Sequence, residues 1–188
     1  MEEVILEDKK LFLFLNNMGN SSFDQLWMTI SGTFVWIPLY VIFLYLLYKN
    51  YQLKSLLYIL LFILIGVTVS DQLSTIFKFG ISRLRPCHDP EIQNHMRIVK
   101  CGGNFGFYSA HASNTFFLAS YLSVLLRKKL RWFPWFILFW ATVVSYSRIY
   151  LGVHFPMDIL MGACVGFLLG GFFGTLALKV INKQNIFS

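Results

Sequence analysis

Charged residues are scarce in this 188-residue sequence: they make up 13% of it, and only nine residues are acidic. A soluble domain of average composition carries about 25% charged residues. Apolar residues instead reach 56%, and the mean hydropathy is +0.60. This balance excludes an ordinary soluble domain and predicts an integral membrane protein, folded as a single domain over residues 1–188.

The sequence also lacks the pattern of a secretory signal peptide. Its first ten residues, MEEVILEDKK, are rich in acids, and only a very short apolar run follows them. A signal peptide has a basic start followed by an apolar region of 7–15 residues. We therefore expect no cleaved leader.

Long apolar runs take the place of charge. Four lie at residues 26–48, 55–77, 132–149 and 156–178, and a fifth over 107–126 is more polar at its start. A helix needs ~20 apolar residues to cross a bilayer. We expect an all-α polytopic membrane bundle of about five transmembrane helices. The preceding segment VILEDKKLFLFLNN is too short to span, which favours an interfacial helix, with a frayed terminus as the alternative.

Acids are absent from three basic segments: the links after the first and third predicted spans, and the C-terminal tail. These segments contain Lys49, Lys54, Arg127, Lys128, Lys129, Arg131, Lys179 and Lys183. Cytoplasmic loops carry an excess of Lys and Arg, so we expect this side to be cytoplasmic. The N-terminus, the 78–106 loop and the link near 150–155 are then extracytoplasmic. This topology accounts for much of the net charge of +7, so no nucleic-acid partner is expected.

Three polar clusters interrupt the apolar pattern, all at predicted extracytoplasmic helix ends. They are KFGISRLRP with Lys78, Arg83 and Arg85, YSAHASN with Ser109 and His111, and SRIYLGVHFPMD with Arg148, His154 and Asp158. Taken singly, Lys78 and Arg85 are typical of cations that snorkel at a membrane edge, and His111 is typical of a polar contact between helices. Asp158 is an acid within a predicted span, and His154 is its nearby partner. Arg83 has no corroborating partner and is expected to contact the surface or a head group.

Together the clusters predict a phosphate site. Lys78, Arg85 and Arg148 would repel one another at a membrane surface unless an anion lay between them, and arginine forks match phosphate oxygens. Of two histidines, one can attack phosphorus and the other can protonate the leaving oxygen, so no metal is required. No carboxylate cluster suited to magnesium accompanies them, and no cofactor is expected. Asp158 follows His154 by four residues and is suited to orient its ring.

These residues resemble the three-part signature of the type 2 phosphatidic acid phosphatase superfamily. In the first part, six residues separate Lys78 from Arg85-Pro86, and the second part is Tyr108-Ser109-Ala110-His111. In the third part, five residues lie between Arg148 and His154, and three lie between His154 and Asp158. The resemblance implies that His154 is the nucleophile, that Asp158 orients the His154 ring, and that His111 is the general acid. It also implies a set of phosphate ligands: Lys78, Arg85, Arg148, Ser109 and the backbone amide of Ala110.

The middle motif departs from the Pro-Ser-Gly-His usual in that family. Tyr108 stands in place of the proline, and Ala110 in place of the glycine. Ala110 keeps its backbone N–H, so the phosphate contact survives if the turn avoids positive φ. We expect Tyr108 to alter the rim of the site rather than its chemistry.

The predicted function is hydrolysis of a lipid phosphate at the extracytoplasmic face of a bacterial cytoplasmic membrane. Undecaprenyl pyrophosphate or lipid A is the favoured substrate, with phosphatidylglycerol phosphate and phosphatidic acid as alternatives. A lipid transporter or scramblase and an inactive interaction protein are the competing classes. A transporter does not require a His and Asp pair beside a second His, and every residue to which the resemblance assigns a side-chain role is present. No oligomeric state is predicted.

The polar insert at 87–106 is expected to contribute head-group selectivity together with the N-terminal segment. Cys87 and Cys101 share this insert, and an oxidising compartment favours a disulfide between them over two free thiols. With His88 and His95 they also raise a zinc alternative, but their spacing matches no standard finger.

Overall fold

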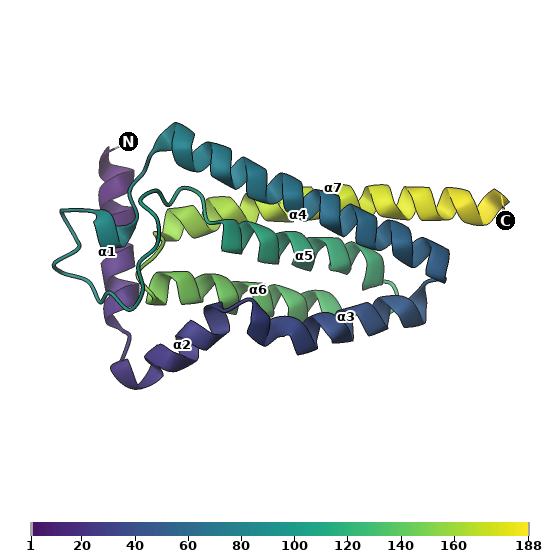
Figure 1. Cartoon of the computed structure of the whole chain (residues 1–188), viewed down its shortest axis with the longest axis horizontal. Helices are drawn as coiled ribbons and strands as arrows, with labels where there is room; N and C mark the ends of the chain where they lie inside the picture. Colours follow the sequence, from purple (N-terminus) through teal and green to yellow (C-terminus); the bar gives the residue numbers. More distant parts are fainter. Residues whose placement is uncertain (1, 188) are drawn as a thin grey trace.

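The computed structural model describes residues 2–187, and seven α-helices occur in this range. They are α1 (Glu2–Asn17), α2 (Asp24–Ser31), α3 (Ile37–Asn50), α4 (Leu53–Ile81), α5 (Ala110–Leu126), α6 (Phe133–Tyr150) and α7 (Pro156–Phe187). Three 3-10 turns join them, at Ser21–Phe23, Phe34–Trp36 and Pro86–His88. Helices α3 to α7 run side by side, and α1 lies across one end of this bundle (Figure 1). The predicted all-α fold is confirmed.

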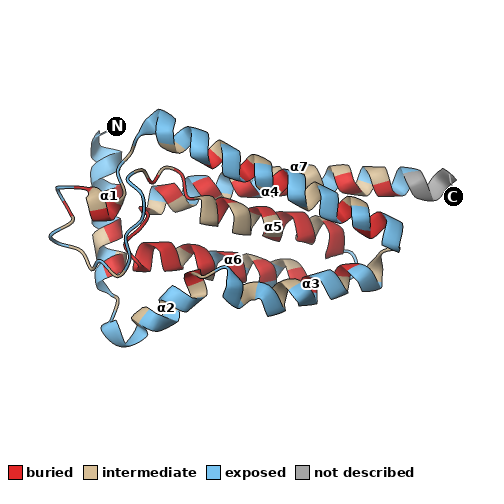
Figure 2. Ribbon diagram, viewed as in Figure 1, coloured by how far each residue is buried: buried red, intermediate tan, exposed pale blue. Residues whose placement is uncertain are grey.

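Two helices, α4 and α7, are each long and apolar enough to cross a membrane, and α2 with α3 form a third candidate if the bent pair is one span. The outer surfaces of α3 and α4 are largely exposed, whereas buried residues concentrate on α5 and α6 (Figure 2). Leu57, Leu64 and Leu168 are each more than 60% exposed. Such an apolar exterior is what a lipid environment favours.

The first predicted span, 26–48, is not one straight helix. Helix α2 ends at Ser31, the backbone at Gly32 is extended, and α2 and α3 differ in direction by 69°. Pro38, which lacks an amide donor, lies in the first turn of α3. The indole of Trp36 donates to the carbonyl of Ile30, 2.8 Å away, which satisfies one carbonyl freed by the break. The break places Ser31 inside the bundle rather than along a continuous span.

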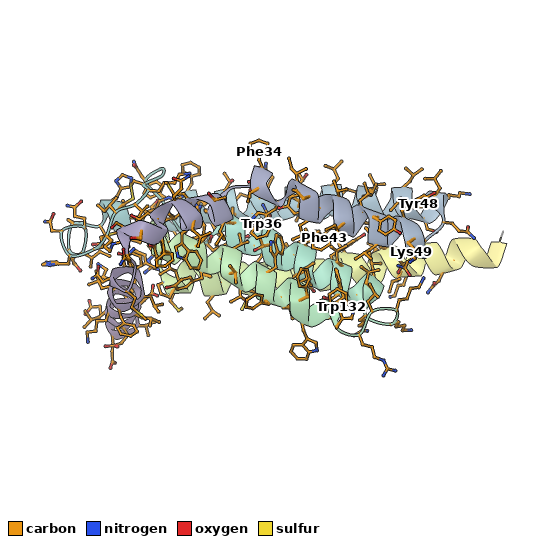
Figure 3. The ribbon with its side chains drawn as sticks, turned by 90° about the horizontal axis from the view of Figure 1, so that it is seen from below. Phe34, Trp36, Phe43, Tyr48, Lys49 and Trp132 are labelled. Atoms are coloured by element: carbon orange, nitrogen blue, oxygen red, sulfur yellow. A yellow bond between two sulfur atoms is a disulfide. The ribbon has the colours of Figure 1, made fainter. Side chains whose placement is uncertain are left out.

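Helix α3 packs its aromatic face against α6. The rings of Trp36 and Trp140 are 5.7 Å apart, and Phe43 contacts both Phe133 and Trp140 edge-on. Phe34, by contrast, is 85% exposed and points away from the bundle, as Figure 3 shows beside the inward Trp36 and Phe43. These aromatic contacts hold the first span against the helices that carry the polar clusters.

Small residues let α7 approach α5 closely. A Cβ added at Gly162, Gly166 or Gly170 would lie 2.5, 2.0 or 2.2 Å from a backbone oxygen of α5 or of the residue that caps it. These glycines recur every four residues, so they share one face of α7. The short separation aligns the first turn of α5, which contains His111, with the first turn of α7, which contains Asp158.

The insert after α4 is closed by a disulfide between Cys87 and Cys101, whose Cα atoms are 5.9 Å apart. This confirms the predicted bond and takes both sulfur atoms that a zinc site there would use. Leu84 and Phe105 form an isolated antiparallel bridge at the base of the insert. The insert is fastened to α1 by Lys9, which pairs with Asp89 and Glu91 at 2.7 Å each.

Candidate active site

Four helix ends meet at the end of the bundle crossed by α1: the ends of α4 and α6 and the starts of α5 and α7 (Figure 1). The three polar clusters predicted from the sequence therefore lie together. Gly152 has φ +84°, a left-handed conformation that glycine adopts without strain, and it turns the chain between α6 and α7. This turn delivers His154, which is 2% exposed, into the centre of the site.

The ring of His154 is held between an acid and an arginine. Its Nδ1 lies 3.4 Å from Asp158 Oδ2, and its Nε2 lies 3.1 Å from Nη1 of Arg85. A guanidinium can only donate, so Nε2 is the acceptor and the proton resides on Nδ1, toward the carboxylate. The lone pair of His154 Nε2 therefore faces Arg85.

Burial governs the protonation of His154. The pKa of His154 is lowered from 6.5 to about 4, chiefly by desolvation and also by the charges of Arg85 and Arg148, against the opposing hydrogen bond and charge of Asp158. The charged imidazolium is disfavoured in such an environment. At neutral pH this histidine is therefore an uncharged base.

Two arginines lie close to the ring, and Lys78 lies close to both of them. Arg85 also donates to the carbonyl of Val153 at 3.1 Å, and Arg148, 7% exposed, donates to the Ser31 hydroxyl. Lys78, in the last turn of α4, interacts electrostatically with both arginines. Within residues 2–187, the buried Nε atoms of Arg85 and Arg148 have no hydrogen-bond partner. These unused donors are suited to the oxygens of an anion.

The middle cluster forms the N-terminus of α5. Ser109 caps the helix by accepting from the amide of Ala112 at 3.4 Å, and its own amide donates to the Asp158 carbonyl at 3.0 Å. Ala110 is the first helical residue and has negative φ, so the motif does not need the glycine usual there. Free amides at a helix start favour anions. His111 follows in the same turn and interacts electrostatically with Arg148 and His154.

Tyr108 does not lie at the rim of the site, contrary to the prediction. Its side chain is fully buried, and its ring lies 5.6 Å from that of Phe77. Its carbonyl accepts from Ser74 of α4 at 3.1 Å. The aromatic ring that stands in place of the usual proline packs against α4.

Arg83 is not a free surface residue, contrary to the prediction. Its Nη1 lies 2.9 Å from Asp158 Oδ1, and its Nη2 lies 2.6 Å from Asp8 Oδ2. Asp8 belongs to α1, and sequence reasoning gave it no role. The sequence shows only an acid within a segment that also carries apolar residues, and its partner lies 75 residues away.

Two cavities approach the site from inside the bundle. A small cavity of about 140 Å³ is lined by His111, Ser31 and Asn114 among others. A groove of about 460 Å³ between α3, α4 and α5 is lined mostly by apolar side chains such as Leu47, Leu60 and Ile63. The two share five lining residues: Thr33, Tyr40, Asn114, Thr115 and Trp140. A larger groove of about 770 Å³ between α1, α6 and α7 has neither histidine in its lining.

The fold is that of a helical membrane protein whose polar clusters gather at one end of the bundle. Residues 55–182 match the model of the PAP2 superfamily. The chain belongs to this superfamily, as its three motifs predicted.

Curated relatives support this membership over nearly the whole chain. A lipid A 4'-phosphatase of Bacteroides thetaiotaomicron is 39% identical over 181 residues, covering 94% of this chain and 77% of the relative. One from Porphyromonas gingivalis is 35% identical over 175 residues, covering 92% and 73%. This chain is therefore a lipid phosphate phosphatase of the PAP2 type and an integral membrane protein.

Solved structures share the fold. The transmembrane PAP2-type phosphatidylglycerolphosphate phosphatase of Bacillus subtilis superposes with a TM-score of 0.75 at 22% identity, covering 96% of this chain and 89% of that one. LpxE of Aquifex aeolicus gives a TM-score of 0.63 at 25% identity, covering 90% and 93%.

Proposed function

We propose that this enzyme removes phosphate from a lipid head group through a phosphohistidine formed at His154. The orientation of the His154 ring carries the proposal. Because Arg85 donates to Nε2 and the proton resides on Nδ1, the Nε2 lone pair faces the cations that would bind a phosphate. Burial keeps this ring uncharged at neutral pH, which a nucleophile requires.

The reaction proceeds in two steps. His154 Nε2 attacks phosphorus, the bond between phosphorus and the lipid oxygen breaks, and His111 donates a proton to that oxygen. Water then attacks the phosphohistidine, His111 takes a proton from this water, and the phosphorus–nitrogen bond breaks to release phosphate. Asp158 stabilises the positive charge that develops on the His154 ring.

The phosphoryl oxygens are held by groups from all three clusters. Arg85 and Arg148 supply their unused Nε donors, and Lys78 adds a charge at the end of α4. The amide of Ala110 adds a donor at the start of α5, where Ser109 fixes the first turn. Donors of this kind act most strongly on the charge that develops in the transition state.

The two neighbouring cavities, which share lining residues, suit the rest of a lipid. Because His111 protonates the leaving oxygen, the lipid alcohol must lie on the His111 side of the phosphate. The small cavity there is lined by Ser31 and Asn114, which offer polar contacts to a head group. The apolar groove beyond it, between α3 and α4, can hold part of a hydrocarbon chain.

We further propose that five spans place this site at the extracytoplasmic face. Helices α5 and α6, of 17 and 18 residues, lie alongside α4 and α7 and would cross at the same depth (Figure 1). The basic links of 127–131 and 49–54 lie at the opposite end of the bundle from α1. Helix α1, lying across the bundle, would then rest in the membrane interface.

Lipid A is the substrate that we propose first, because two relatives covered over more than 70% of their length are lipid A 4'-phosphatases. Purified enzyme would be assayed for phosphate release from lipid A, undecaprenyl pyrophosphate, phosphatidylglycerol phosphate and phosphatidic acid side by side. The largest kcat/KM is expected for lipid A. A larger value for another lipid would reassign the substrate, and no release from any of them would refute the proposal.

Two histidine variants test the mechanism against a matched control. His154→Ala should abolish release from every substrate, whereas His88→Ala, in the insert, should retain activity. His111→Ala should lose most activity on a lipid phosphate but retain more on p-nitrophenyl phosphate, whose leaving group needs no proton. Vanadate, which mimics five-coordinate phosphorus, should inhibit, and EDTA should not. Full activity of His154→Ala, or loss in EDTA that a divalent metal restores, would exclude this mechanism.

A further inference from the structure

Asp8 is a buried acid that the proposed reaction does not use. It belongs to α1, yet its carboxylate is 2% exposed and makes two contacts outside that helix. Its Oδ1 accepts from the amide of Met157 at 2.9 Å, and its Oδ2 accepts from Arg83 at 2.6 Å. Met157 is the second residue of α7, so Asp8 satisfies an amide donor that the start of this helix leaves free.

Arg83 joins this acid to the acid of the catalytic pair. One arm of its guanidinium bonds Asp8 and the other bonds Asp158, and the group stacks 4.2 Å from the centre of the Phe155 ring. Two buried carboxylates this close would repel one another without a cation between them. Burial raises the pKa of Asp8, and Arg83 opposes that shift.

The contacts of Asp158 show why its placement depends on this bridge. Its Oδ2 accepts from the amide of Phe155 at 3.0 Å and lies 3.4 Å from His154 Nδ1. Its Oδ1 is held by Arg83. The bond to the histidine is the longest of the three, so the other two donors determine where the carboxylate stands when the ring approaches phosphorus.

Apolar packing holds α1 in the position that the bridge requires. Phe12 of α1 is fully buried, and its ring lies 5.3 Å from that of Phe155. Ile149 and Ile92 complete this cluster. Asn16, one turn further along α1, donates to the carbonyls of Ile149 and Tyr150 at 3.1 and 3.0 Å. The N-terminal helix is thus docked directly on the segment that carries His154.

From this chain of contacts we infer that Arg83 and Asp8 are positioning residues for the reaction, and that α1 acts on the site through Asp8 alone. The inference rests on the proposed role of His154. Arg83 holds the Asp158 carboxylate against His154, and Asp8 fixes Arg83 to α1. Neither residue contacts the phosphate, so their loss lowers the rate of the chemical step and leaves substrate binding in place.

Steady-state kinetics of Arg83→Lys, Arg83→Ala and Asp8→Ala test this inference. Lysine keeps the charge but not the planar fork, so it cannot bridge both acids. Each variant should lose kcat by about 10- to 100-fold, as is typical when a partner that orients an active-site ligand is removed, with KM little changed. Added guanidinium ion should restore part of the kcat of Arg83→Ala relative to sodium chloride at equal ionic strength.

Lys9→Gln is the matched control. Lys9 neighbours Asp8 on α1 and its ion pairs also fasten this helix, but to the insert rather than to Asp158. It should keep kcat close to that of the unmodified enzyme. Unchanged kcat in both Arg83 variants, an equal loss in Lys9→Gln, or no rescue by guanidinium would overturn the inference. Activity in His154→Ala would instead refute the proposed function.

Discussion

At the scale of single residues, the environment of His154 decides its chemistry. The ring is buried between a carboxylate and a guanidinium, and each partner specifies one nitrogen. The sequence placed His154 at an extracytoplasmic helix end, and the structure shows that the residue is buried there rather than open to water. A buried neutral imidazole is a better nucleophile than a solvated one that is partly protonated near neutral pH.

The depressed pKa of His154 is directly measurable. The chain has four histidines, so NMR titration with assignment by His154→Asn is practicable. Because burial lowers the pKa to about 4, the midpoint should lie well below 6.5 in the folded protein and return to about 6.5 in denaturant. Between these values the unfolded chain binds more protons, so the folded state loses stability as the pH falls from 6.5 toward 4. A folded-state midpoint at or above 6.5 would contradict this assignment.

At the scale of elements, the site depends on how closely α5 and α7 approach. Helix α5 supplies the amides of its first turn and His111, and the first turn of α7 contains Asp158, whose Oδ2 lies 3.4 Å from His154 Nδ1. Glycines at 162, 166 and 170 permit this approach because a side chain would overlap the α5 backbone. Helix α4 is held against α5 by polar contacts, which include the hydrogen bond of 2.7 Å between the hydroxyls of Ser70 and Ser113.

Gly166→Ala tests this packing. Its Cβ would lie 2.0 Å from the Ser113 carbonyl oxygen, so the helices must separate, at a cost of about 1–3 kcal/mol typical of overpacking. Gly171→Ala is the control, because its nearest neighbour, Ser120 Oγ, is 3.4 Å away. Thermal unfolding in detergent should show a lower midpoint for the first variant only. Equal midpoints for the two proteins would mean that close α5–α7 contact is not required.

At the scale of the whole molecule, the two ends of the bundle carry different polar groups. The end crossed by α1 holds the site and the disulfide-closed insert, and the other holds the basic links (Figure 1). In Figure 3, Lys49 and Trp132 lie far from α1 along the bundle. Lys129 donates to the Asn50 carbonyl at 2.6 Å, which ties the two basic links together. Such a distribution favours a fixed orientation in the membrane.

Cysteine labelling tests that orientation. In a Cys164→Ala background, Asn94→Cys would report on the insert and Lys128→Cys on the link between α5 and α6. Both positions are exposed. An impermeant maleimide should label Asn94→Cys in cells whose cytoplasmic membrane is intact, and Lys128→Cys only after that membrane is disrupted. The reverse pattern would place the site in the cytoplasmic leaflet.

The apolar helices, the proximity of His154 to Asp158 and the disulfide could be predicted from the sequence because each depends on residues that are close together in the chain. Apolar runs follow the length of a spanning helix, and His154 and Asp158 are four residues apart, so their proximity needs no tertiary information. The order of the clusters at alternate helix ends placed them on one face. The pairing of Cys87 and Cys101 also lies within one short insert, and the structure contains that bond.

Only the tertiary structure decided which distant groups complete the site. Arg83 bonds Asp8 across 75 residues, and Arg148 reaches Ser31 across 117 residues through the break between α2 and α3. A bent span and a continuous one have nearly the same apolar composition, and Tyr108 gives no local sign that it is buried. Such contacts depend on which distant residues the packed helices bring together, and a single polar side chain carries no pattern in the chain that identifies its partner.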